Sequence, residues 1–100
     1  MKDYLDNFNL KGKKAFIFGG CGLIGQEISE AFLSAGARIN VFDTDKKTGK
    51  HLKKKFKSTK FKFNYFDLTN LKKFNQNIDR LLRLFGCPDI FVNCSYPVTK

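Results

Sequence analysis

The segment Gly19–Gly25 has the glycine spacing of a phosphate-binding turn. Gly20, Gly22 and Gly25 satisfy the pattern G-x-G-x-x-G, between a short apolar run and a segment with helical spacing. In such a turn the glycines allow a tight reversal, close approach of the backbone to a pyrophosphate, and close packing of helix on strand. The N-terminus of the following helix offers free N–H groups and a positive dipole end to the phosphates. The sequence therefore predicts that this turn binds a dinucleotide.

Asp43 stands where such a site needs an acid. It ends the second apolar run, eighteen residues after Gly25. A carboxylate there accepts hydrogen bonds from the adenosine ribose hydroxyls and repels a ribose 2′-phosphate, which predicts NAD rather than NADP. Two alternatives remain open. Asp43 would otherwise only start a turn or cap the next helix, and the basic Lys46 and Lys47 would partly accommodate a phosphate.

The elements that must position these residues alternate along the chain. Strands are predicted over residues 15–18, 38–42, 61–66 and 89–93, the second and third ending in Asp43 and Asp67. Helices are predicted over about 23–34, 46–56 and 71–85, the last with Thr69 or Asn70 as its N-cap. Gly36 and Gly86 end the first and third helices.

This order, β-α-β-α-β-α-β, predicts an α/β fold with a Rossmann-like parallel sheet and right-handed crossovers. Four strands alone leave a sheet edge and apolar helix faces uncovered. We therefore expect residues 1–100 to be the N-terminal part of one NAD(P)-binding domain, a fragment truncated before its second half.

Composition excludes several classes of protein. Apolar residues make up 42% of the chain, which suits a packed core and excludes a disordered chain. The sequence has neither an apolar run of about 18 residues nor an N-terminal secretion signal, so no membrane association is expected. Cys21, Cys87 and Cys94 match no zinc-site spacing, and reduced thiols in a cytoplasmic protein explain them. No metal site is expected, and the single histidine, His51, is predicted to be a surface residue.

A solvated surface explains the net charge of +10. Nine lysines fall between Lys46 and Lys62 with no acid among them. A solvated helix face with its following loop accounts for such a run, and the aromatic–basic pattern of single-strand binders is missing. No nucleic-acid partner is expected, although the charge would attract anionic ligands over a long range.

In this order and register, three segments resemble the short-chain dehydrogenase/reductase family. They are Phe18–Gly25, Asp67-Leu68-Thr69 after the third strand, and Asn93-Cys94-Ser95 after the fourth. The resemblance implies an NAD-dependent oxidoreductase of which this chain holds the cofactor-binding half. It places an acid near the adenine ring and an asparagine that positions the cofactor. The implied cofactor-binding residues are Gly19, Gly20, Cys21, Gly22, Leu23, Ile24, Gly25, Asp43, Asp67, Leu68, Asn93, Cys94 and Ser95.

The chain departs from the family pattern at Phe18, in its glycine spacing, and in ending before the family's catalytic residues. Phe18 replaces a threonine that links the glycine turn to the asparagine segment. The tail Asn93–Pro97 resembles a subgroup found near surface-sugar and flagellin-modification genes. The family's catalytic Ser, Tyr and Lys lie beyond residue 100, so the chain alone is expected to be inactive. Tyr96 and Lys100 have the Tyr-x-x-x-Lys spacing, but Pro97 disfavours the helical geometry that such a pair needs.

Other functions stay open on the residues themselves. The spacing of Gly19, Gly22 and Gly25 resembles the extended branch of the family, which implies a nucleotide-sugar epimerase or dehydratase. A non-catalytic nucleotide-binding module and, as the weakest alternative, a basic nucleic-acid binder also remain. For the complete protein we expect a small carbonyl or alcohol substrate and a homo-oligomer.

Overall fold

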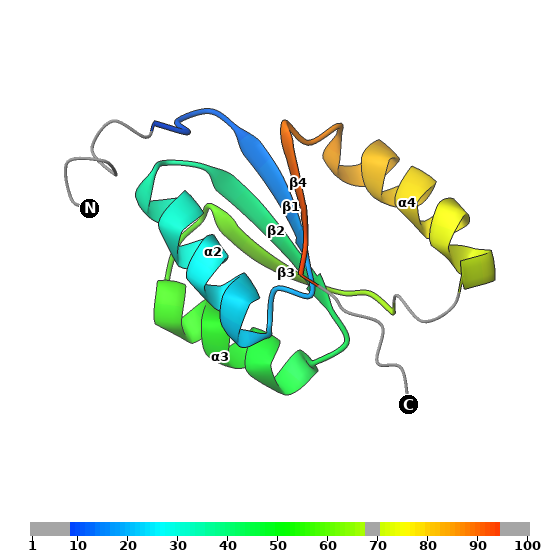
Figure 1. The fold of residues 1–100 in the computed structure, drawn as a ribbon, viewed down its shortest axis with the longest axis horizontal. Helices are drawn as coiled ribbons and strands as arrows, with labels where there is room; N and C mark the ends of the chain where they lie inside the picture. The colour runs from blue at the N-terminus through cyan, green and yellow to red at the C-terminus, as the bar shows by residue number, and fades with distance from the viewer. Residues whose placement is uncertain (1–8, 68–70, 95–100) are drawn as a thin grey trace.

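The computed structural model describes residues 9–67 and 71–94, and gives only the backbone for residues 71–75. Strands and helices alternate along the whole described chain (Figure 1). The elements are β1 (Lys14–Phe18), α2 (Leu23–Ser34), β2 (Arg38–Asp43), α3 (Lys46–Phe56), β3 (Phe61–Tyr65), α4 (Leu71–Phe85) and β4 (Ile90–Asn93). The predicted succession of elements is confirmed. β1 begins one residue earlier than predicted, β3 ends one residue earlier, and β4 begins one residue later.

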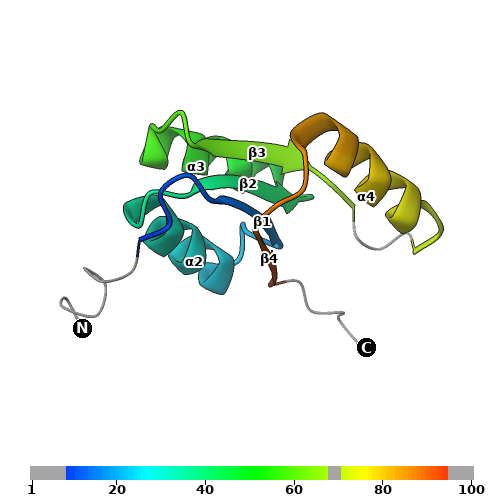
Figure 2. The ribbon, with the colours of Figure 1, turned by 90° about the horizontal axis from the view of Figure 1, so that it is seen from above.

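The four strands form one parallel sheet in the order β3-β2-β1-β4 (Figure 2). Phe18 at the end of β1 lies between Phe42 of β2 and Asn93 of β4. The chain therefore builds outward from β1 on one side through β2 and β3, and then crosses to the other side of β1 for β4. This arrangement confirms the predicted α/β fold with a Rossmann-like sheet.

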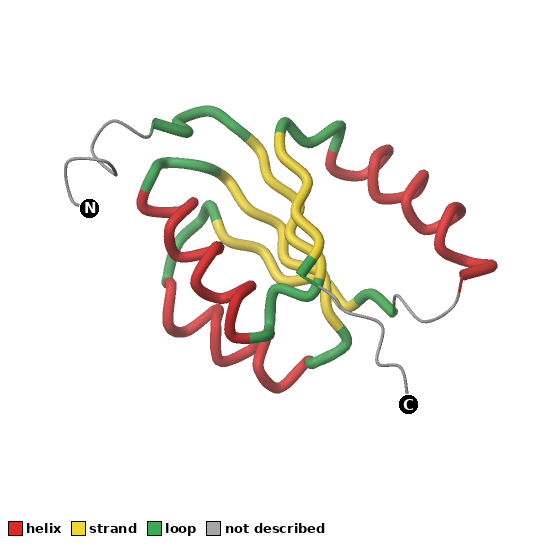
Figure 3. Tube along the Cα trace, viewed as in Figure 1, coloured by secondary structure: helices red, strands yellow, loops and turns green. Residues whose placement is uncertain are grey.

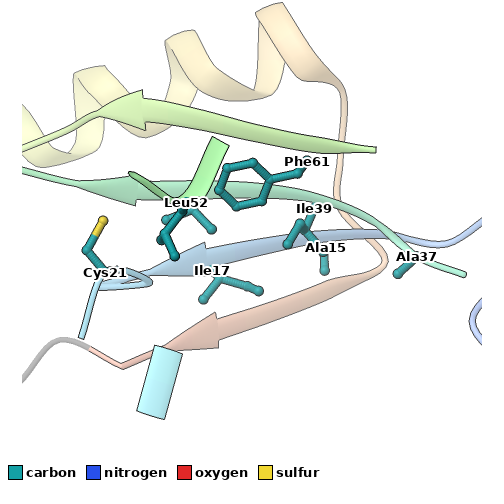
Figure 4. Packing of buried hydrophobic residues seen from close by; sticks show 8 residues of the cluster. Ala15, Ile17, Cys21, Ala37, Ile39, Leu52 and Phe61 are labelled. Carbon is teal, nitrogen blue, oxygen red and sulfur yellow. The ribbon is translucent and has the colours of Figure 1, made fainter. Parts of the chain in front are cut away.

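The helices cover both faces of the sheet, α2 and α3 on one and α4 on the other (Figure 1). Successive strand residues point to opposite faces, so each strand contributes side chains to two hydrophobic cores. The core under α2 and α3 contains buried Ala15, Ile17, Cys21, Ala37, Ile39, Val41, Leu52 and Phe61 (Figure 4). Continuous apolar strands are what a parallel sheet buried on both faces requires.

The core under α4 is built almost entirely from phenylalanine. Phe16, Phe18, Phe42 and Phe66 are buried there with Leu81, and Ile78, Leu82 and Phe85 of α4 pack against them. The rings of Phe18 and Phe42 stack with centroids 4.7 Å apart, and Phe66 meets Phe18 edge-on. Such pairs stabilise a core beyond the area that they bury. The apolar side chains of α4 that the structure describes thus share one face of the helix.

Local signals in the sequence explain where the helices begin and end. Gly36 and Gly86 have φ angles of 97° and 78°, a left-handed conformation that favours glycine after a helix. The side chain of Asp45 caps α3 by accepting a hydrogen bond from the backbone N–H of Thr48. The proposed caps of α4, Thr69 and Asn70, lie outside the described residues.

The charged surface matches the expectation from sequence. All nine lysines from Lys46 to Lys62 are exposed, as is His51. None of the cysteines Cys21, Cys87 and Cys94 is in a disulfide. No helix in the described part of the chain has both the length and the apolar character that a bilayer crossing needs.

Candidate functional site

The carboxyl ends of β1, β2 and β4 lie side by side at one edge of the sheet (Figure 3). The backbone N–H of Gly19 donates to the carbonyl of Phe42 at 2.8 Å, and that of Cys94 donates to the carbonyl of Phe18 at 2.7 Å. The crossover direction changes between β1 and β4, which makes this edge the topological switch point of the sheet. Open α/β sheets bind their ligands at this topological switch point.

Each glycine of the turn meets a different packing demand. Gly19 has a φ of 75° and makes the reversal after β1. A Cβ on Gly20 would lie 2.5 Å from a methyl of Val41, and one on Gly25 would lie 2.5 Å from the Cα of Gly20. A Cβ on Gly22 would make an ordinary van der Waals contact, 3.7 Å from the carbonyl oxygen of Gly19. The turn therefore excludes a side chain at Gly20 and Gly25 and has room for a methyl group at Gly22.

The N-terminus of α2 has unsatisfied backbone donors. Its N-cap is Gly22, no side chain caps it, and its first turn contains no acid. The first N–H groups of a helix have no partner inside the helix and carry the positive end of its dipole. By contrast, α3 is capped by Asp45. Of the helices α2 and α3, the one without a side-chain cap at its N-terminus is therefore α2, which begins at the glycine turn.

Asp43 lies against this turn, and its carboxylate is held in place. One carboxylate oxygen accepts the backbone N–H of Cys21 at 3.0 Å, and the other accepts the N–H of Asp45 at 3.1 Å. A carboxylate has about four acceptor positions, so two hydrogen bonds leave capacity for ribose hydroxyls. Asp43 is not the helix cap, because Asp45 fills that role. A role in the turn after β2 therefore explains the hydrogen bond of Asp43 to Asp45, but not its hydrogen bond to Cys21.

Cys21 differs from the expectation for a thiol beside a helix N-terminus. Such a position would lower its pKa. In the structure, burial together with the nearby Asp43 and Asp45 carboxylates raises the pKa of the Cys21 thiol to about 12. The backbone of Cys21 is held by two hydrogen bonds, because its N–H donates to Asp43 and its carbonyl accepts Nε2 of Gln26 at 2.8 Å. The side chain of Cys21 packs into the core. The sequence had indicated no role for Gln26.

The basic residues after Asp43 are not equally free to meet a phosphate. The ammonium of Lys46 lies 4.8 Å from the ring centroid of Tyr65, a cation–π contact. Lys47 is exposed and lies near Asp45, whose pKa it helps to lower. Tyr65 itself is 55% exposed, so this aromatic ring at the end of β3 lies at the surface.

The other site residues that the structure describes lie around the same edge. Leu23 and Ile24 in the first turn of α2 are 84% and 54% exposed, although both are large and apolar. Asp67 and Asn93 are exposed, and Cys94 is half-buried, with burial raising its pKa. Leu68 and Ser95 lie outside the described residues.

A link between β1 and β4 exists although Phe18 replaces the family's threonine. The rings of Phe18 and Phe91 stack with centroids 4.8 Å apart, next to the backbone bond from Cys94 to Phe18. Phe91 had no role in the sequence interpretation. Its place in strand register beside Phe16 is the only signal that would have found it, and strand order is needed to see it.

The model of the short chain dehydrogenase family matches residues 13–95, which includes every described site residue. The chain belongs to the short-chain dehydrogenase family. Proteins of this family bind nicotinamide dinucleotides, and the expected family resemblance is confirmed.

Individual members show how much of the family's length is present. The chain is 36% identical over 93 residues to the sorbose reductase of Candida albicans, covering 88% of this chain and 32% of that protein. It is 32% identical to the "Probable NADP-dependent mannitol dehydrogenase" of Yarrowia lipolytica, covering 98% of this chain and 36% of that protein. The chain thus spans about a third of the length of these relatives.

A solved structure supports the same family. The 2-keto-3-deoxy-D-gluconate dehydrogenase from Streptococcus agalactiae superposes with a TM-score of 0.74 at 30% identity. The match covers 99% of this chain and 38% of that one. The described sheet and helices therefore have the arrangement found in that part of a short-chain dehydrogenase.

Proposed function

We propose that this short-chain dehydrogenase chain is the cofactor-binding part of an NAD-dependent oxidoreductase. The observation that carries the proposal is the position of the Asp43 carboxylate, hydrogen-bonded to the glycine turn at the switch point of the sheet. In this proposal residues 1–100 are the N-terminal part of a single Rossmann domain.

The turn and the helix it begins would hold the pyrophosphate. Gly22 has no side chain to cover the uncapped N–H groups of α2, which would donate to the phosphate oxygens. The exposed side chains of Leu23 and Ile24 would then lose apolar surface to the bound cofactor. Asp67 with Leu68, and Asn93 with Cys94 and Ser95, would line the two ends of the same cofactor.

The choice between NAD and NADP rests on charge. A 2′-phosphate at about 4 Å from the Asp43 carboxylate costs on the order of 1 kcal/mol in water and about 4 kcal/mol at an effective dielectric constant of 20. The site is half-buried, so we expect at least about a tenfold preference for NAD. The contact of Lys46 with Tyr65 supports this choice, because it engages the nearest candidate for a phosphate partner. The NADP named for the Yarrowia lipolytica relative is a property of that protein.

The chemistry in the complete protein is hydride transfer between the cofactor and a carbonyl or alcohol carbon. The bound nicotinamide supplies the hydride, and this chain supplies its position. The relatives are named for sorbose, mannitol and 2-keto-3-deoxy-D-gluconate, so a polyhydroxylated substrate is our proposal for this protein. Tyr96 and Lys100 lie outside the described residues, and we keep the prediction that they are not a catalytic pair.

The test compares the affinities of NADH and NADPH by calorimetry in the wild type and two variants. Asp43→Asn removes the charge while keeping the shape of the side chain, and Asp79→Asn removes the same charge from the exposed surface of α4. The wild type and Asp79→Asn should prefer NADH by about tenfold or more, and Asp43→Asn should lose most of that preference. Equal affinity for both cofactors in the wild type would refute the proposed role of Asp43.

A further inference from the structure

A second cleft lies at the amino ends of the strands, at the opposite edge of the sheet from the glycine turn. Its charged lining is Lys14, Arg38, Lys60 and Lys62, which we call the basic cleft. Asn40 of β2 also lines it, and Leu84 and Phe85 of α4 form its apolar wall. Its volume is about 240 Å³. The family resemblance and the cofactor site use none of these side chains.

Strand register gathers these cations from distant parts of the sequence. Lys14 of β1 is the direct partner of Arg38 of β2, and Asn40 is the partner of Lys62 in β3. The carbonyl of Lys60 accepts the N–H of Ile39 at 2.7 Å, which holds Lys60 beside the start of β2. Neighbouring strands are about 4.8 Å apart, so three adjacent strands bring four positive charges to one edge.

Within the described part of the chain no carboxylate forms an ion pair with this cluster. The nearby acid is Asp89, whose carboxylate accepts the backbone N–H of Lys14 at 2.9 Å. None of the four cations forms an ion pair with a described residue. Like charges held this close repel each other, and an anion placed among them would relieve that repulsion.

Two of the polar groups are already positioned. The ammonium of Lys14 donates to the carbonyl of Phe85 at the end of α4. An ammonium has three protons, so two stay available for a ligand. Asn40 is only 7% exposed, and its Oδ1 accepts Nδ2 of Asn64 at 3.3 Å. The Nδ2 group of Asn40 has no hydrogen-bond partner among the described residues, so this buried side chain still has donors to offer.

We propose that the basic cleft binds a small anion with one or two phosphate groups. Cofactor and drug-sized pockets measure roughly 300–1,000 Å³, so this cleft is too small for a dinucleotide. The planar guanidinium of Arg38 matches two oxygens of a phosphate, and the lysines add point charges around it. The site is separate from the cofactor site, and its ligand is held by side chains rather than by a helix N-terminus.

The first arm of the test locates the ligand by NMR, with inorganic pyrophosphate as the probe and the 100-residue chain as the protein. The amide signals of Lys14, Arg38, Asn40 and Lys62 should shift as pyrophosphate is added. Shifts confined to Gly19–Gly25 would mean that pyrophosphate occupies only the glycine turn, and would overturn the proposal. No binding at either place would overturn it as well.

The second arm uses charge variants with a matched control. Arg38→Gln combined with Lys62→Gln removes two exposed charges from the cleft, and Lys50→Gln combined with Lys54→Gln removes two exposed charges from α3. The cleft variant should weaken pyrophosphate binding by about tenfold or more, because charge-assisted contacts are lost, and the control by less than about twofold. An equal loss in both variants would show only an effect of net charge.

The third arm tests whether the partner is a small anion or a nucleic acid. A single-stranded oligonucleotide is titrated in parallel at the same ionic strength, since both interactions depend on salt. Binding of pyrophosphate that depends on the cleft charges supports the proposal. If the oligonucleotide binds the chain and pyrophosphate does not, the ligand is a polymer rather than a small anion, and the proposal is overturned.

Discussion

The carboxylate of Asp43 accepts the backbone N–H of Cys21 over 3.0 Å, across 22 residues of sequence. This contact joins the end of β2 to the glycine turn after β1. The acid proposed to bind ribose and the turn proposed to bind pyrophosphate therefore form one unit. Such preorganisation lowers the ordering cost of binding a cofactor.

Gly22 and Gly25 of the turn should respond differently to alanine. A Cβ on Gly25 would press on the Cα of Gly20 and the carbonyl of Gly19, at 2.5 and 2.6 Å. Gly25→Ala should therefore lower the free energy of unfolding by about 1–3 kcal/mol, as overpacking does. Gly22→Ala meets nothing closer than 3.7 Å and should change it by less than about 0.5 kcal/mol, while weakening dinucleotide binding.

Urea unfolding and calorimetry with NADH measure these two effects separately. The pair is its own control, because each variant adds one methyl group to the same turn. Equal losses of stability in both variants would show that the turn is not packed as described.

Cys21 should be the least reactive thiol of the chain. With its pKa raised to about 12, only about one molecule in 10,000 carries the thiolate at pH 8. The exposed Cys87 serves as an internal reference. Iodoacetamide followed by peptide mapping should label Cys87 first and Cys21 last, with all thiols labelled in denaturant. Rapid labelling of native Cys21 would mean that the turn opens or that the Asp43 contact is absent.

The cap of α3 predicts a pH dependence of stability. Hydrogen bonds from Thr48 lower the pKa of Asp45 below its ordinary value of 3.8. A carboxylate whose pKa is lower in the folded than in the unfolded protein stabilises the fold fully at a pH above its unfolded-state pKa. This stabilisation is lost as the pH falls through the folded-state pKa. Asp45→Ala should therefore lower the melting temperature near neutral pH, with a difference that shrinks below pH 3.8.

Thermal unfolding followed by circular dichroism over a pH series measures this difference. Asp79→Ala, at an exposed position on α4, controls for the loss of one negative charge. A difference between Asp45→Ala and the wild type that stays constant into acid would contradict the cap as its source.

Local pattern predicted most of this fold because its signals are local. The apolar run Ala15–Phe18 followed by glycines, and the helical spacing after Leu23, need no knowledge of the rest of the chain. Gly36 and Gly86 are at the helix ends for the same reason, since each must adopt a positive φ. Asp43 was found because the motif fixes its distance along the chain.

The properties that depend on strand order could not be predicted in this way. Burial raises the pKa of Cys21 most, and carboxylates more than twenty residues away raise it further, so the helix terminus beside it does not lower it. The stack of Phe18 on Phe91 requires β4 to lie beside β1. The basic cleft likewise exists only because β1, β2 and β3 are neighbours in register.

The most direct test of the cofactor site is an NMR titration of the 100-residue chain with NAD. The account predicts shifts at the amides of Gly19–Gly25, Asp43 and Asn93, and smaller shifts with NADP at the same concentration. Binding should be weaker than about 1 µM, because the described surface covers only part of a dinucleotide, whereas tight sites bury most of their ligand. Shifts absent from the glycine turn, or NADP binding as well as NAD, would contradict the account.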